Sequence, residues 1–268
     1  MTRASGATHY ATPATLATVG VDIARLETGV AGTYLLVEPE AVNLVPYARP
    51  TAATWSALSP TVVTNRSAPA LGYFSGITVA SGGADWHRAL QLLSITSGVS
   101  YRVSVFAQSG SSGRMRLVFR DTMSGAETRI IGAFGALATS TSAAGSVANI
   151  SETVLADGQT RLIEATFVPN FSGSVQLGVG PDSAVSGRNV HVLGVQIEAG
   201  STATSFVDTG ASAQTRAADV PTVNGISGTY DVTATFDSGA QTVYSAQSVV
   251  DGYWPAGLSG KITKLEFE

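Results

Sequence analysis

Apolar and polar residues alternate with a period of two along most of this chain, a pattern typical of strands that turn one face to a core. The odd positions are apolar in Val99–Ala107 and again in Arg114–Arg120. The same pattern predicts further strands at Thr33–Glu38, Leu71–Ala80, His87–Ile95, Arg161–Val168, Ser174–Val179 and Asn189–Glu198. In the last of these, the alternation shifts by one residue at Leu193-Gly194, which predicts a β-bulge.

Turn residues fall between these strands, and helix signals are few. Such spacing is typical of two packed antiparallel sheets. We therefore predict an all-β protein whose residues 43–210 form a jelly-roll β-sandwich. Residues 1–42 are expected to form an N-terminal extended or strand segment used for docking. Residues 215–268 are expected to form a small C-terminal β-module, since Gly228–Phe236 and Gln241–Ala246 are typical of a hairpin. The small and polar segment Ala138–Ser146 is interpreted as an exposed loop.

Composition narrows the functional classes. Charged residues make up 13% of the chain and there are 29 glycines, a mixture unfavourable to helices. The formal net charge of −4 gives no basic field for duplex nucleic acid, so we expect no nucleic-acid partner. Cysteine is absent, which excludes disulfides and thiolate metal sites. No apolar run reaches the roughly 18 residues of a membrane span, so we expect no membrane insertion.

The sequence offers no catalytic constellation. His9, His87 and His191 are far apart in the sequence and lack metal-binding spacing. The segment Gly178–Pro181 follows a strand without leading into a helix, and we interpret it as a turn. A glycosidase needs two facing carboxylates, and no pair stands out. We therefore predict no catalytic residue, no enzymatic activity and no cofactor.

One metal site is kept as an alternative. Jelly-roll modules hold structural calcium through oxygen ligands of the first and last strands, and Glu38 and Asp208 could supply such oxygens. The simpler interpretation is that both are ordinary surface carboxylates.

The aromatic residues give the main indication of binding. Trp86, His87 and Arg88 follow the glycine-rich Ser81–Gly83, and Tyr73 precedes them in the neighbouring strand. Sugars stack on aromatic rings, and planar donors such as arginine hold their hydroxyl or carboxylate groups. These four side chains are the predicted carbohydrate-binding residues. The alternative is that such rings fill the core.

Two neighbouring groups are interpreted differently. For Trp55 and Tyr101 we favour the core. Four arginines share the outward phase of predicted strands and would form a stripe on one sheet: Arg102, Arg114, Arg116 and Arg120. The stripe is either a solvated face or an anion-binding surface for acidic polysaccharide.

Longer motifs carry a family resemblance. Residues 34–47, Tyr-Leu-Leu-Val-Glu-Pro-Glu-Ala-Val-Asn-Leu-Val-Pro-Tyr, resemble a segment of phage-encoded carbohydrate-binding-like domains. Residues 196–210, followed by Thr-Arg-Ala-Ala-Asp at 215–219, are similar to the closing motif of the same domains. Residues 2–8 and 228–233 also match, so the resemblance extends over nearly the full chain. The family is that of the head-spike and tail-fibre proteins of phages and gene transfer agents.

The resemblance implies a virion component, made in the bacterial cytoplasm and carried on the particle surface. It would bind host cell-surface (capsular) polysaccharide for adsorption and would contact other spike, fibre or capsid subunits. We expect an oligomer assembled through β-surfaces or a partner subunit, because the sequence has no coiled-coil heptads. Two alternatives stay open: a structural adaptor or decoration protein that binds no glycan, and a polysaccharide depolymerase.

Overall fold

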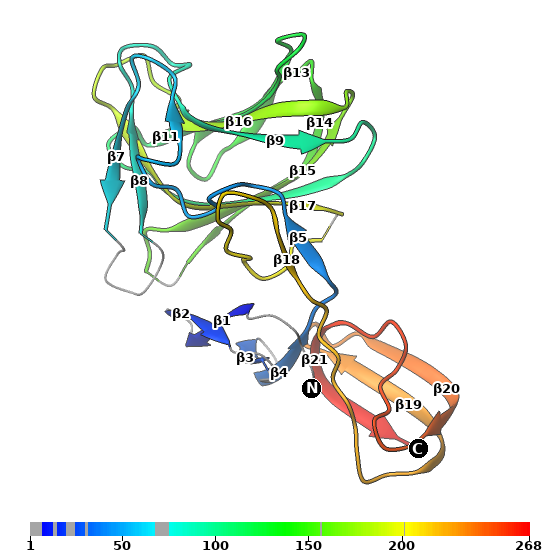
Figure 1. The fold of residues 1–268 in the computed structure, drawn as a ribbon. Helices are drawn as coiled ribbons and strands as arrows, with labels where there is room; N and C mark the ends of the chain where they lie inside the picture. Colours follow the sequence, from blue (N-terminus) through cyan, green and yellow to red (C-terminus); the bar gives the residue numbers. More distant parts are fainter. Residues whose placement is uncertain are drawn as a thin grey trace. The chain divides into compact units, whose positions relative to one another are not determined.

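A computed structural model describes residues 7–12, 15–19, 25–29, 32–67, 75–155, 157–200 and 202–268 (Figure 1). Every regular element of these residues is a β-strand, so the predicted all-β class is confirmed. In this described part of the chain, no helix is long and apolar enough to span a membrane.

The chain divides into two compact units. The sandwich unit comprises Val42–Ala203 and Val207–Gln214, and the terminal unit comprises Met1–Ala41, Thr204–Phe206 and Thr215–Glu268.

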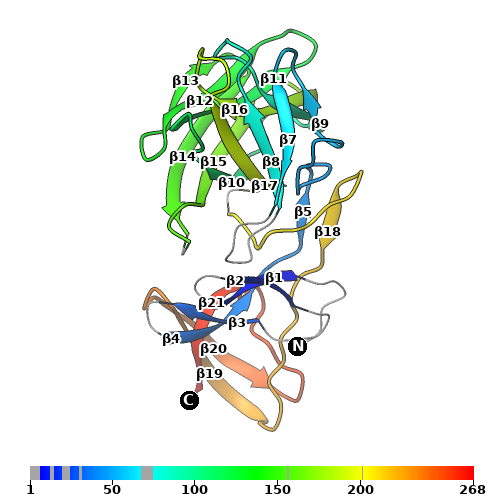
Figure 2. The ribbon, with the colours of Figure 1, turned by 90° about the vertical axis from the view of Figure 1, so that its left-hand side faces the viewer.

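The sandwich unit consists of two antiparallel six-stranded sheets. Sheet A has the order β14-β15-β10-β17-β8-β7, and sheet B has the order β13-β12-β11-β16-β9-β6. The strands of sheet A are β7 (Val62–Arg66), β8 (Gly76–Ala80), β10 (Tyr101–Gln108), β14 (Gly145–Val154), β15 (Arg161–Pro169) and β17 (Asn189–Ala199). Those of sheet B are β6 (Ser56–Ala57), β9 (Ala89–Ile95), β11 (Arg114–Asp121), β12 (Glu127–Ala133), β13 (Ala138–Ser142) and β16 (Gly173–Pro181). The chain passes back and forth between the sheets, as in a jelly roll (Figure 2).

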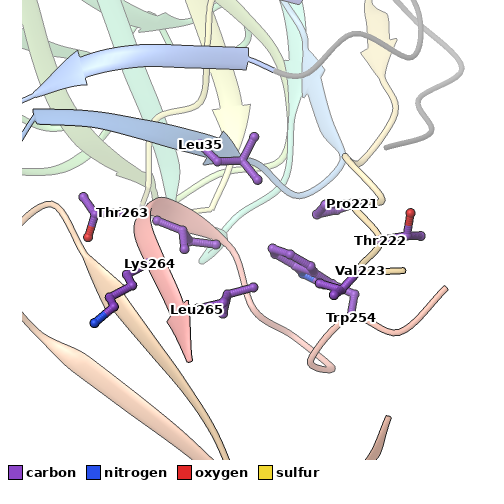
Figure 3. Close-up of a pocket in the computed structure, with 9 residues that line it drawn as sticks. Leu35, Pro221, Thr222, Val223, Trp254, Thr263, Lys264 and Leu265 are labelled. Carbon is purple, nitrogen blue, oxygen red and sulfur yellow. The ribbon is translucent and has the colours of Figure 1, made fainter. Parts of the chain in front are cut away.

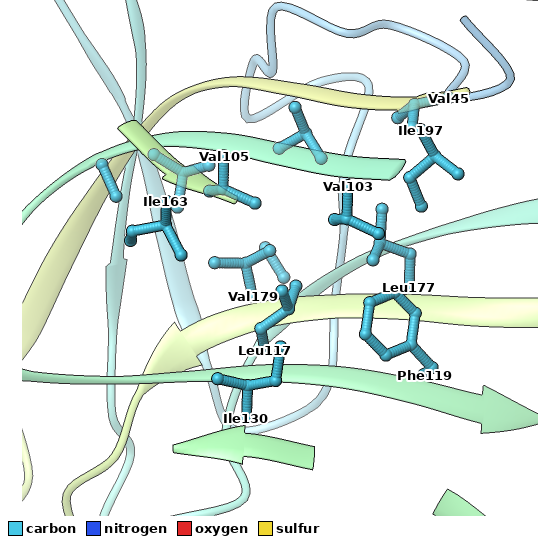
Figure 4. Close-up of a cluster of buried hydrophobic side chains, with 14 of the residues drawn as sticks. Val45, Val103, Val105, Leu117, Phe119, Ile130, Ile163, Leu177, Val179 and Ile197 are labelled. Carbon is cyan, nitrogen blue, oxygen red and sulfur yellow. The ribbon is translucent and has the colours of Figure 1, made fainter. Parts of the chain in front are cut away.

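Apolar side chains of both sheets meet in one core (Figure 4). The odd positions of β10 and β11 point into it, as the alternation predicts. Phe119 of β11 stacks on Phe167 of β15, with ring centroids 4.2 Å apart. Trp55 and Tyr101 belong to this core, which confirms their predicted role. Each large apolar side chain buried here contributes about 1.5–3 kcal/mol, so the sandwich has a strong hydrophobic driving force.

The β-bulge predicted in β17 is confirmed. Against β10, the register changes from Phe106↔Gly194 to Ala107↔Val192, which leaves Leu193 as the extra residue. Because of this residue, Val195 faces the same core as Val192 despite the odd spacing.

Two segments differ from the prediction. Ala138–Ser142 is the edge strand β13, paired with β12, and not part of a loop. Small polar residues suit an exposed edge, which hides the strand from a hydrophobic pattern. Gly178–Pro181 is not a turn but lies inside β16. Its glycines have a packing role that appears only in the folded structure.

The terminal unit is built on a five-stranded antiparallel sheet of order β20-β19-β21-β4-β3. Its strands are β3 (Arg25–Gly29), β4 (Gly32–Val37), β19 (Gly228–Phe236), β20 (Gln241–Val249) and β21 (Gly260–Phe267), and β1 (Ala7–Thr12) pairs separately with β2 (Thr15–Val19). The predicted hairpin corresponds to β19 and β20.

The terminal unit joins parts of the chain that the sequence prediction treats separately. Strand β21 pairs with β4, with Gly260 opposite Val37. The N-terminal segment and the C-terminal module therefore share one sheet and a small core around Val37, Ala234 and Ile262. A hairpin alone is marginal in water, and the added strands supply the missing apolar face. The linking segments β5 (Ala41–Asn43) and β18 (Gln214–Arg216) also pair with each other.

Candidate functional site

The loop before β9 is organised around His87. Its Nδ1 accepts the backbone N–H groups of Gly82 at 2.7 Å and Ala84 at 3.3 Å. An accepting Nδ1 leaves the proton of the neutral ring on Nε2. That Nε2 is buried without a hydrogen-bond partner in the described part of the chain, and the side chain is only 2% exposed. His87 therefore fixes the loop through its Nδ1 and does not present its ring to solvent.

Trp86 lies beside this buried ring and is open to solvent. The two ring centroids are 4.4 Å apart at an interplanar angle of 70°, and Trp86 is 41% exposed. Indoles in sandwich cores are usually buried. An indole that is exposed to solvent and held in place by a neighbouring ring has the geometry that stacking against a sugar requires.

Arg88 is buried, unlike the solvent-facing fork that the sequence suggested. Its side chain lies over β16, where a Cβ on Gly178 would come 2.3 Å from the Arg88 Cδ atom. A Cβ on Gly180 would come equally close to the His87 carbonyl oxygen. Because these glycines have no side chain, Arg88 can lie directly on the outer face of sheet B.

The guanidinium of Arg88 then connects the loop to sheet B. Nη2 donates to Glu127 Oε1 at 3.0 Å and to Gln176 Oε1 at 3.3 Å. Nη1 donates to the Trp86 carbonyl oxygen at 3.4 Å. Through these hydrogen bonds, Arg88 holds the backbone of Trp86 against the outer face of sheet B.

The predicted arginine stripe is split between the sheets. Arg114, Arg116 and Arg120 lie on β11 in sheet B, but Arg102 lies on β10 in sheet A and pairs with Glu164 at 3.2 Å. Strands β10 and β11 are consecutive in the chain but belong to opposite sheets, so a shared outward phase does not imply a shared surface.

Three carboxylates link the arginines of sheet B. Arg116 contacts Asp85 at 2.6 Å and Asp182 at 3.2 Å, and Asp182 also pairs with Arg114 at 2.6 Å. Glu127, besides its bond to Arg88, accepts Arg129 Nε at 2.6 Å. Asp85 thus ties the loop of Trp86 to β11.

Glu127, Arg129 and Asp182 belong to this network but are not among the predicted site residues. The charged residues Glu127 and Arg129 are spaced by two and precede Ile130-Ile131, a signal that could have indicated strand β12.

The pKa values of the buried pair follow from this network. Burial is the largest influence on the pKa of Arg88 and lowers it, and the like charges of Arg120 and Arg116 lower it further. The charge and hydrogen bond of Glu127 raise this pKa but do not outweigh the lowering. Burial is the largest influence on Glu127 and raises its pKa, but the hydrogen bond and charge of Arg129, with Arg88, outweigh it and lower the pKa overall. The Arg88–Glu127 contact, with Nη2 3.0 Å from Oε1, is an ion pair.

The remaining predicted residues lie elsewhere. Tyr73 is outside the described residues. Glu38 accepts the Ser205 N–H at 2.7 Å and lies 3.5 Å from Arg216 Nη2. Asp208 lies 3.3 Å from Arg49 Nε. In the ranges that the structure describes, no three His, Asp or Glu side chains are grouped to hold a metal ion, and the calcium site stays a prediction.

A separate groove of about 380 Å³ lies in the terminal unit (Figure 3). Leu35, Val223, Trp254 and Leu265 are among its mostly apolar lining residues, and no arginine of the described residues contributes to it. The indole N–H of Trp254 donates to the Leu258 carbonyl oxygen at 3.1 Å, so this ring is partly committed to packing. We therefore centre the candidate site on Trp86 and the outer face of sheet B.

No protein-family model matches the chain, and no curated protein matches its sequence. Among solved structures, this chain is similar to the CBM22-1 and GH10 modules of Clostridium thermocellum endo-1,4-beta-D-xylanase 10B complexed with xylohexaose. The two sequences are 16% identical, and the TM-score is 0.39. That match covers 60% of this chain and 29% of the Clostridium chain.

The CBM22-1 xylan-binding domain of Paenibacillus barcinonensis Xyn10C is 14% identical with a TM-score of 0.37, over 60% of this chain and 94% of that domain. The CBM22-2 xylan-binding domain of the same protein is 12% identical with a TM-score of 0.37, over 58% of this chain and 98% of that domain.

Proposed function

We propose that this protein is a non-enzymatic virion component, a head spike or fibre subunit, whose sandwich unit binds host cell-surface polysaccharide for adsorption. The virion role rests on the motifs at residues 34–47 and 196–219, which resemble those of head-spike and tail-fibre proteins. The binding role rests on one observation: Trp86 is exposed while the two residues that follow it, His87 and Arg88, are buried and hydrogen-bonded.

The chemistry of the site supports this proposal. A sugar ring placed on the indole would bury its C–H face, and the neighbouring arginines would donate to its polar groups. Arg88 and His87 act here as positioning residues. Because they fix the loop before ligand arrives, less conformational entropy is lost on binding.

The test compares two tryptophans. Binding of the full chain to immobilised bacterial capsular polysaccharides is measured for the wild type, Trp86→Ala and Trp55→Ala. Trp86→Ala should weaken binding by about tenfold with an almost unchanged melting temperature, since its ring is exposed. Trp55 is 2% exposed and lies in the core, so Trp55→Ala should lower stability by about 3–5 kcal/mol.

Three results would reject the proposal. Equal binding by wild type and Trp86→Ala would remove this surface as the site. No binding to any polysaccharide at about millimolar concentration would favour the structural adaptor. A fall in polymer length during incubation would instead indicate a depolymerase.

A further inference from the structure

The outer face of sheet B carries an excess of positive charge. Five arginines lie on this face or border it: Arg88, Arg114, Arg116, Arg120 and Arg129. The carboxylates that contact them among the described residues are three: Asp85, Asp182 and Glu127. The whole chain has a formal net charge of −4, so this face has the opposite sign to the molecule.

Arg120 is the centre of this excess. In the sheet register it lies between Glu127 on β12 and Gln176 on β16. Glu127 already receives Arg88 on Oε1 and Arg129 on Oε2, and Gln176 Oε1 also receives Arg88. In the described part of the chain, no carboxylate forms an ion pair with Arg120. Its charge acts instead on Arg88, whose pKa it helps to lower after the larger effect of burial.

The exposed and buried members of the cluster have different roles. The side chains of Arg88 and Arg116 are nearly inaccessible, and they hold the carboxylates in place. Arg114 and Arg129 reach solvent, with side-chain exposures of 50% and 37%. Leu92 of β9 lies opposite Gln176 of β16, which in turn lies opposite Arg120. Leu92 therefore adds an exposed apolar side chain to the same row of residues across the sheet.

We propose that the polysaccharide bound at this site is acidic, with carboxylate groups that pair with Arg120 and Arg129 while sugar rings stack on Trp86. This inference rests on the proposed function and specifies its ligand class. The planar fork of arginine matches the two oxygens of a carboxylate. A neutral glycan would leave the excess charge uncompensated, and an acidic one replaces the missing partner of Arg120.

The experiment uses acidic polysaccharides and their carboxyl-reduced, neutral counterparts, which have the same linkages. Polygalacturonate, alginate and hyaluronate supply the acidic probes. Dissociation constants of the full chain are measured at low and high ionic strength. The acidic member of a pair should bind about tenfold more tightly than its reduced form, and salt should remove most of this difference.

Variants separate charge from stacking. Arg120→Gln and Arg129→Gln should each weaken binding of the acidic polymer about three- to tenfold, and should weaken binding of the reduced polymer, whose hydroxyl groups carry no charge, much less. Trp86→Ala should weaken both. Arg102→Gln is the matched control, because it removes the same charge from sheet A and should change neither.

The outcomes distinguish the two proposals. Equal affinity for acidic and reduced polymers, with no effect of Arg120→Gln, would overturn the acidic ligand and leave glycan binding intact. A lack of binding to both classes would overturn the proposed function itself. Equal losses with Arg102→Gln and Arg120→Gln would indicate a general charge effect and not this site, which also overturns the inference.

Discussion

At the residue scale, the same side chain serves opposite purposes in different surroundings. Trp55 fills the core and donates its indole N–H to the Tyr47 carbonyl oxygen at 2.9 Å. Trp86 is exposed because the buried His87 beneath it supports the ring and the loop. Local flanking residues pointed to Trp86 correctly as the more exposed ring. They did not reveal that His87 and Arg88 would be buried, because that depends on Gly178 and Gly180 far along the chain.

Another residue-scale feature is His191 on the outer face of sheet A. It lies opposite Thr78, whose Oγ1 is 2.9 Å from its Nδ1. Burial, and secondly the charge of Arg66, lower the pKa of His191 from 6.5 to about 4. The ring is therefore neutral in the folded protein throughout the physiological range.

This neutral histidine predicts acid sensitivity with a definite sign. The unfolded chain takes up a proton at His191 near pH 6.5, but the folded chain does so only near about pH 4. Acid in this window therefore favours unfolding, and the free energy of unfolding should fall between pH 6.5 and 4. His191→Gln should flatten this dependence, measured by denaturant midpoints at about pH 7 and pH 5. If the variant lost stability in parallel with the wild type, His191 would not be the responsible group.

At the element scale, β16 is the strand that makes the site. Its glycines let the Arg88 side chain and the His87 backbone lie directly on sheet B. The sequence of this segment predicts a turn, because glycine and proline usually mark turns. In the folded chain they mark a close approach between two segments, the other common role of glycine within a strand.

Substitutions in β16 should therefore disturb the loop. Gly178→Ala meets the middle of the Arg88 side chain, and Gly180→Ala meets the His87 carbonyl oxygen. Both should lower stability, by about 1–3 kcal/mol, and weaken glycan binding, with Gly180→Ala the more severe because backbone cannot rotate away. Melting temperature and affinity are measured for each. Gly210→Ala is the control, since its Cβ would have no neighbour within 4 Å. Wild-type behaviour of both β16 variants would show that the close packing of Arg88 is not required.

At the scale of the whole molecule, the two units have separate cores. The sandwich unit holds the candidate site, and the terminal unit gathers strands from both ends of the sequence into one sheet. For a spike or fibre subunit, repetition would multiply a weak single-site affinity through avidity.

Self-association is the prediction at this scale. The purified chain should form an oligomer whose mass is a multiple of 27.3 kDa, measured by light scattering after size-exclusion chromatography. The oligomer should also dissociate from a polysaccharide-coated surface more slowly than protein that has been diluted until it is monomeric. A stable monomer at high concentration would reject self-assembly and indicate that oligomerisation requires a partner subunit.

The all-β class, the inward positions of β10 and β11 and the bulge in β17 follow from the sequence alone. These features depend on period-two alternation, which is local and is fixed by which face of a strand meets a core. The tertiary structure sets which sheet each strand joins, and it therefore separates Arg102 from Arg114. It also paired Arg88 with Glu127, 39 residues apart in sequence. Such choices depend on packing among distant segments, which no local pattern encodes.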